Sequence, residues 1–176
     1  MSDLTQKRIE ALEVALTNEK RESEFYLKHA QRTSNPLGKR MFETLSKDET
    51  EHYQRILELH KKLKAGGKWP ETLPLKVKDT DAGDVLKKVV EGVDTSNAAD
   101  TDDMEAVKIA IAFETKGEAF YKQLAENVED PLEKAFYGML ESIEREHRLS
   151  LEDTYEYFKD PEGWYQRMEK PHLDGA

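Results

Sequence analysis

Two segments of this chain share one hydrophobic spacing, and each places two polar residues in the middle of it. In the first, steps of three and four residues connect Phe42, Leu45, Glu49, His52, Ile56, Leu59 and Leu63. In the second, the same steps connect Tyr137, Leu140, Glu144, His147, Leu151, Thr154 and Phe158. Such steps place side chains on one face of an α-helix. Both segments are therefore expected to form long helices that turn a glutamate and a histidine toward a helical core.

The two halves of the chain repeat one another. Residues 19–54 align without a gap with residues 114–149, and 11 of the 36 aligned positions are identical. Chance similarity between amphipathic helices explains matched leucines, but not two Glu-x-Glu-His runs at the same distance from a matched glutamate. An internal repeat of a helical hairpin is the better explanation. The chain is therefore expected to be all-α, a four-helix bundle of two pseudo-symmetric hairpins.

Helix-breaking residues divide the chain. The expected parts are one domain over residues 1–160, with hairpins at about 3–64 and 102–159 and a crossover at 65–101, followed by a C-terminal tail at 161–176. The crossover is long for a plain loop, which suits a connection between opposite ends of a bundle, and a short helix is expected in it at 81–92. Asp102 and Glu105 are expected to form a capping box at the third helix. Trp164 and Tyr165 are expected to dock the tail onto the bundle or onto a second subunit.

Composition excludes several kinds of site. The chain has no cysteine, which excludes disulfides, thiol catalysis, thiolate zinc sites and iron–sulfur clusters. A net charge of −10 disfavours binding to nucleic acid or to an anionic membrane. No stretch approaches the roughly 18 apolar residues of a membrane span, and the N-terminal residues lack the apolar run of a signal peptide. A cytoplasmic protein is expected.

Four carboxylates and two imidazoles are expected to meet inside the bundle. They belong to Glu19, Glu49, His52, Glu114, Glu144 and His147, whereas Glu51 and Glu146 lie off the inward face and are expected in solvent. Each buried carboxylate without a partner costs several kcal/mol, and a whole domain is stable by only about 5–15 kcal/mol. Two divalent cations would balance the four negative charges. Mixed carboxylate and imidazole ligation suits iron or manganese, and this constellation is that of ferritin-like di-iron proteins.

With these residues, the chain resembles the ferritin-like di-iron domain of the rubrerythrin family over about residues 9–158. The resemblance implies two iron ions, with manganese or mixed iron, manganese and zinc as alternatives. It also implies an oxidoreductase that reduces hydrogen peroxide or dioxygen. A ferroxidase or iron-storage protein and a non-enzymatic metal-binding bundle remain alternatives. Tyr26 and Tyr121 would hydrogen-bond the ligating glutamates, or would be core aromatic residues whose hydroxyls reach carbonyl groups.

The chain departs from the family pattern in two ways. The family's rubredoxin-like module needs cysteines, so electrons are expected from a separate donor, a rubredoxin-like or other redox protein. Where the family has a further glutamate after the third-helix ligand, this chain has Gly117, and Glu22 or Glu118 would substitute as an extra ligand or remain a surface charge. A homodimer or small homo-oligomer is expected. Surface roles are expected for the remaining histidines, His29, His60 and His172.

Overall fold

The computed structural model describes residues 3–66, 68–70, 80–85 and 99–169. Its helices are α1 (Asp3–Arg32), α2 (Pro36–Gly66), α4 (Thr101–Asn127), α5 (Pro131–Lys159) and α6 (Pro161–Glu169). Residues 82–85 form a further helical turn, and the rest of the short helix expected at 81–92 lies largely outside the described residues. In the described part of the chain, no helix combines the length and the apolar character needed to cross a membrane.

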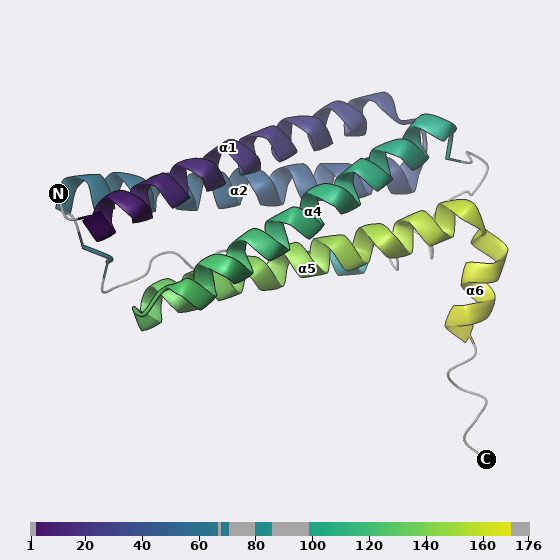
Figure 1. Ribbon diagram of the computed structural model, residues 1–176. Helices are drawn as coiled ribbons and strands as arrows, with labels where there is room; N and C mark the ends of the chain where they lie inside the picture. Colours follow the sequence, from purple (N-terminus) through teal and green to yellow (C-terminus); the bar gives the residue numbers. More distant parts are fainter. Residues whose placement is uncertain (1–2, 67, 71–79, 86–98, 170–176) are drawn as a thin grey trace, which may run out of the picture.

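The four long helices form two hairpins, α1 with α2 and α4 with α5, that lie side by side (Figure 1). Between the hairpins, α1 contacts α4 and α2 contacts α5. The expected all-α, ferritin-like four-helix bundle is confirmed. The helix α6 follows α5 and turns away from the long axis of the bundle (Figure 1).

Equivalent residues begin the second helix of each hairpin. The Asn35 side chain accepts a hydrogen bond from the Gly38 amide at 2.9 Å. Asp130 accepts from the amides of Leu132 and Glu133 at 2.9 and 3.1 Å. A proline follows each capping residue, and the first helical turn suits proline because an N–H there would have no partner within the helix. The internal repeat therefore extends to the caps.

The N-terminal cap of α4 differs from the one expected from the sequence. The N-cap is Asp100, whose side chain accepts from the Asp103 amide at 2.7 Å, while the Asp103 side chain accepts from the Asp100 amide. The capping box predicted at Asp102 and Glu105 is therefore wrong by two residues. Arg32, the last residue of α1, donates to Asp103 at 2.6 Å. This long-range ion pair favours Asp103 inside the capping box, and no local pattern could reveal it.

Two apolar clusters fill the bundle, and a polar layer separates them. One includes Tyr26, Ala30, Leu37, Met41, Phe42, Leu45, Ala106, Val107, Ala110 and Leu151. The other includes Ile9, Leu12, Ala15, Ile56, Leu59, Leu63, Tyr121, Ala125, Phe136, Tyr137 and Leu140. On each long helix, the members of this polar layer lie in sequence between members of the two clusters: Glu19 on α1, Glu49 and His52 on α2, Glu114 on α4, and Glu144 and His147 on α5. The polar layer is thus shielded from water on both sides along the bundle axis.

The aromatic residues after α5 pack on the bundle. Trp164 is only 6% exposed, and its ring meets Tyr157 of α5 edge-on at 5.6 Å. Tyr165 lies 6.2 Å from the same ring. Part of the expected tail is therefore the ordered helix α6, seated against the chain's own α5.

The histidines outside the polar layer have different surroundings. His29 is half-buried, with its ring 4.3 Å from that of Phe25 and 5.7 Å from that of Phe42, so it packs partly against the aromatic core. His60 pairs with the exposed Glu13 at 3.1 Å. His172 lies outside the described residues.

Candidate metal centre

Six side chains from all four long helices converge in the polar layer, and each is at most 2% exposed. They are Glu19 of α1, Glu49 and His52 of α2, Glu114 of α4, and Glu144 and His147 of α5. Their ligand atoms form two groups within which all atoms lie within 4.8 Å of one another. The first group is Glu19, Glu49, His52 and Glu144, and the second group is Glu49, Glu114, Glu144 and His147. These are the residues that the two repeated motifs predicted as metal ligands.

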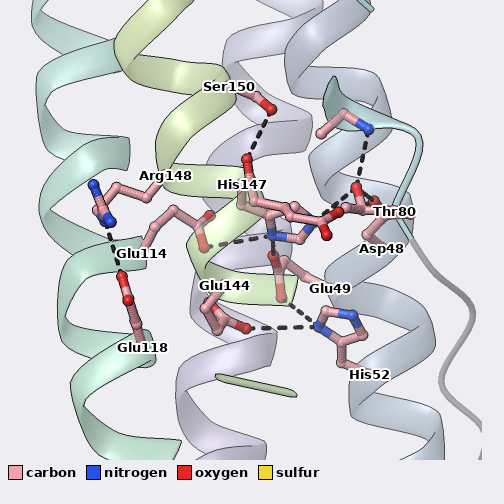
Figure 2. Close-up of polar contacts among 12 residues, drawn as sticks. Asp48, Glu49, His52, Thr80, Glu114, Glu118, Glu144, His147, Arg148 and Ser150 are labelled. Carbon is pink, nitrogen blue, oxygen red and sulfur yellow. Dashed lines mark hydrogen bonds and ion pairs between the residues drawn. The ribbon is translucent and has the colours of Figure 1, made fainter. Parts of the chain in front are cut away.

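Glu49 and Glu144 belong to both groups. His52 Nδ1 lies 3.1 Å from Glu19 Oε2, 3.0 Å from Glu49 Oε2 and 3.8 Å from Glu144 Oε1. His147 Nδ1 lies 3.1 Å from Glu49 Oε1 and 3.4 Å from Glu114 Oε2. Figure 2 shows the contacts of the two imidazoles with Glu49, Glu114 and Glu144. Because Glu49 turns one oxygen toward each imidazole, the two groups can hold two ions that share carboxylates.

Without metal, the carboxylates share protons unevenly. Burial, and next the charge of Glu49, raise the pKa of Glu19 to about 8. Burial and the charge of Glu49 also raise the pKa of Glu144 well above its ordinary value. Burial acts to raise the pKa of Glu49 too, but His52 and His147 lower it below its usual range. Glu49 is thus held as an anion, whereas Glu19 and Glu144 keep their protons more readily.

The imidazoles respond in the opposite sense. Burial opposes their protonation, but Glu49 and Glu19 raise the pKa of His52 to about 10. Against the same effect of burial, the charge of Glu114 and the close contacts with Asp48, Glu114 and Glu49 raise the pKa of His147 well above its usual value. Protons therefore supply the positive charge that the buried carboxylates require, and cations can replace them.

Orphaned buried atoms test whether metal ions fit this layer. Among the described residues, Glu49 Oε1, Glu114 Oε2, both Glu144 oxygens and His147 Nδ1 form no hydrogen bond of good geometry. Such groups are rare in protein interiors because each costs about 1–3 kcal/mol. All of these atoms belong to candidate ligand residues, and because Glu49 and Glu144 are shared by both groups, ions bound there would satisfy them. The donor set fits iron or manganese, which accept carboxylate and imidazole ligands.

Two tyrosines connect the hairpins through the glutamates that open the motifs. The Tyr26 hydroxyl donates to Glu114, and the Tyr121 hydroxyl donates to Glu19. Burial and the charge of the accepting glutamate raise the pKa of each tyrosine well above its usual value, which keeps both as phenol donors. Each tyrosine thus orients the glutamate of the opposite hairpin.

We expect Tyr26→Phe and Tyr121→Phe each to destabilise the protein by roughly 1–3 kcal/mol, the cost of leaving a buried acceptor without its donor. The carboxylate oxygen left behind is buried and loses its donor. Urea unfolding with and without Mn²⁺ measures the effect. The matched control is Tyr137→Phe, because the Tyr137 hydroxyl has no hydrogen-bond partner among the described residues. A loss as large in the control would contradict the assigned role.

The two candidates for an extra carboxylate lie in different places. Glu22 is only 4% exposed, and it accepts a hydrogen bond from Arg21 at 2.7 Å. Glu118 pairs with Arg145 at 2.8 Å and Arg148 at 2.9 Å, and Figure 2 shows it directed away from the centre. Neither belongs to the two groups. Glu22 lies beside the centre, and Glu118 lies in ion pairs outside it.

The absence of a side chain at Gly117 leaves room for the Glu144 carboxylate. A Cβ atom at this position would lie 2.6 Å from Glu144 Oε2 and 3.1 Å from Glu144 Cδ. The carboxylate shared by the two groups thus occupies the space that a side chain at position 117 would need. A glutamate at position 117, where the family has one, would therefore not fit beside Glu144 in its present position.

Gly117→Ala is expected to push Glu144 from its rotamer and to weaken metal binding. An off-rotamer side chain costs about 0.5–1.5 kcal/mol, which corresponds to roughly a twofold to tenfold loss of affinity. Mn²⁺ titration calorimetry measures it. Gly138→Ala provides the control, since nothing lies within 4 Å of a Cβ atom there. Unchanged affinity in Gly117→Ala would show that Glu144 can move freely.

Two residues beside His147, Asp48 and Thr80, were not among the residues predicted from the sequence. His147 Nε2 lies 3.2 Å from Asp48 Oδ2 and 3.1 Å from Thr80 Oγ1, and the Thr80 hydroxyl donates to Asp48 Oδ2 at 2.6 Å. Asp48 had a signal, since it directly precedes Glu49 in the inward motif. Thr80 had none, because it lies in the crossover, far from any motif. Its position ties the crossover to the centre.

Comparison with known proteins agrees with this geometry. The model of the Rubrerythrin family matches residues 10–101, just over half of the chain. The match spans nearly all of the first hairpin and the crossover as far as the start of α4. No curated protein and no solved structure gives a significant match.

Proposed function

Because the chain belongs to the rubrerythrin family, we propose that it is a di-iron oxidoreductase that reduces hydrogen peroxide with electrons from a separate donor protein. The observation that carries the proposal is the sharing of Glu49 and Glu144 by two buried groups of metal-binding residues. Two iron ions there would supply Lewis acidity and the two electrons that, with two protons, convert one hydrogen peroxide into two water molecules.

The residues of the chain contribute positioning and charge. Glu49 and Glu144 would hold both ions at one separation, and His52 and His147 would bind as neutral imidazoles. Tyr26 and Tyr121 fix the remaining glutamates through hydrogen bonds across the bundle. The apolar clusters on either side limit the access of water. Low polarity around the layer strengthens the electrostatic interactions within it.

The composition of the chain supports the proposal of a separate electron donor. Four cysteine thiolates hold the iron of a rubredoxin-like centre, and this chain has no cysteine. The electrons that return the metal ions to the reduced state would then arrive from another redox protein. We propose that this donor protein binds the enzyme and transfers electrons to the metal ions.

Rapid mixing of the reduced protein tests the reaction. The protein is loaded without oxygen with two Fe²⁺ per chain and mixed with hydrogen peroxide or with dioxygen, while absorbance follows the oxidation. We expect peroxide to oxidise the centre at least about tenfold faster than dioxygen and to take up two electrons per molecule. The control is Glu49→Gln, which should give no rapid phase.

The other outcomes are equally informative. Equal rates with dioxygen would remove the basis for a peroxidase. Continued oxidation of Fe²⁺ far beyond two ions per chain would indicate a ferroxidase instead. Tight binding of two ions without any oxidation would indicate a structural metal site.

A further inference from the structure

The internal repeat is broken at two positions beside the metal centre. Asp48, next to Glu49, corresponds to Ile143, next to Glu144. Glu22, three residues after Glu19, corresponds to Gly117, three residues after Glu114. The ligands themselves obey the repeat, so these differences make otherwise equivalent halves of the centre unequal.

The second group has an outer support at its histidine. With the proton on Nε2, His147 donates to Asp48, and Nδ1 presents its lone pair to the carboxylates of the group. Asp48 is held in turn by the Thr80 hydroxyl, which also accepts from the Ala82 amide at 3.0 Å. A carboxylate on the outer nitrogen fixes the tautomer and the ring orientation of a ligating histidine and increases its basicity.

The first group lacks this support. His52 Nε2 is buried and has no hydrogen-bond partner in the described ranges of the chain. The residue equivalent to Asp48 is Ile143, which is 3% exposed and has no side-chain atom that could accept a hydrogen bond. The imidazole of His52 is therefore held only on the side that faces the carboxylates. No hydrogen bond to Nε2 from the described residues fixes the tautomer and ring orientation of His52 before a metal ion binds.

Glu22 adds a second difference between the halves. It is 4% exposed and accepts a hydrogen bond from Arg21 at 2.7 Å. The equivalent residue of the other half, Gly117, has no side chain.

We propose that the two metal positions are unequal: the second group binds its ion first and more tightly, and Asp48 is the positioning residue that makes the difference. The inference rests on the dinuclear centre of the proposed function but not on its reaction. It predicts a singly loaded protein whose ion contacts His147 and not His52.

Titration of the metal-free full chain with Mn²⁺ tests the inequality. Calorimetry should resolve two steps that differ by at least about tenfold in Kd. Crystals grown with less than one Mn²⁺ per chain should show anomalous scattering at the second group. Equal scattering at both positions, or a first ion beside His52, would overturn the proposal.

Matched variants assign the difference to Asp48. Asp48→Ala should weaken the tighter step about 10–100-fold and leave the weaker step nearly unchanged. Ile143→Ala truncates the equivalent residue of the other half and should leave the ratio of the two Kd values unchanged. Ile143→Asp should tighten the weaker step by supplying His52 with an acceptor. Thr80→Val removes only the hydroxyl that holds Asp48 and should weaken the tighter step in the same direction, which covers the case that Asp48→Ala does not fold.

Failure of the role assigned to Asp48 can be distinguished from failure of the proposed dinuclear centre. If Asp48→Ala weakens both steps equally, the positioning role is wrong while the dinuclear centre stands. If the unmodified protein binds fewer than two ions, the proposed function itself is contradicted.

Discussion

Replacement of Glu49 by glutamine is expected to abolish the binding of both metal ions, because Glu49 presents an oxygen to each group. Glu19→Gln should affect mainly the ion of the first group, and Glu114→Gln mainly that of the second. A bound ion at a thousandfold excess over its Kd stabilises the folded state by about 4 kcal/mol. For a chain of this size, that corresponds to roughly 8–16 °C in Tm per ion. The rise in Tm caused by Mn²⁺ should therefore disappear in Glu49→Gln.

The same motif provides the control. Glu51 lies two residues further on, is half-exposed and pairs with Arg55 at 3.8 Å. Glu51→Gln should keep both ions and the full rise in Tm. Mass spectrometry of the metal content and thermal unfolding monitored by circular dichroism measure the two effects. Two ions retained in Glu49→Gln would contradict the shared role of this carboxylate.

The metal-free protein is expected to lose stability as the pH rises from about 5 to about 10. The pKa of Glu19 and that of Glu22 are raised from 4.5 to about 8, and the pKa of His52 is raised from 6.5 to about 10. Burial raises the two carboxyl pKa values, whereas Glu49 and Glu19 raise that of His52 against the effect of burial. In this window the folded chain binds more protons than the unfolded chain, so its stability falls with rising pH. Glu49 has a lowered pKa, and its contribution is lost only on acidification.

Metal ions should reverse this trend. Ligands must lose their protons before they bind, so the affinity for Mn²⁺ rises with pH and binding releases protons. Urea unfolding between pH 5 and pH 9, with a chelator or with Mn²⁺, measures both slopes. Glu22→Gln removes one of the titrating groups. In this variant, the stability of the metal-free protein should therefore fall less steeply with rising pH. A metal-free protein that gains stability toward pH 9 would contradict the assignment.

The repeat and the helical spacing were sufficient to predict the six candidate ligands. A helix with steps of three and four residues can bury only one face, so Glu49 and His52 had to share that face with Leu45 and Ile56. The same reasoning applied to Glu144 and His147. The residue types then restricted the chemistry, because buried carboxylates require counter-charges. The structure brings all six together within the bundle.

Contacts between segments far apart in the chain could not be predicted in this way. Spacing along one helix does not reveal which residue of another helix it meets, and therefore Tyr26 was not assigned to Glu114 in particular. The capping box at Asp100 and Asp103 depends in part on Arg32, about 70 residues earlier. The contact of Thr80 with Asp48 depends on the path of the crossover.

The sequence by itself therefore determined the helices, their inward faces and the set of ligands, since periodicity and residue chemistry are local properties. The tertiary structure decided how the two halves differ. Packing of α4 against α5 within the second hairpin places Glu144 over Gly117, and packing between the hairpins and the crossover places the Asp48–Thr80 pair behind His147. His52 received no such support within the described residues, because its neighbour in the repeat is Ile143. The asymmetry of the centre arises from packing across the repeat, which no single segment of the sequence contains.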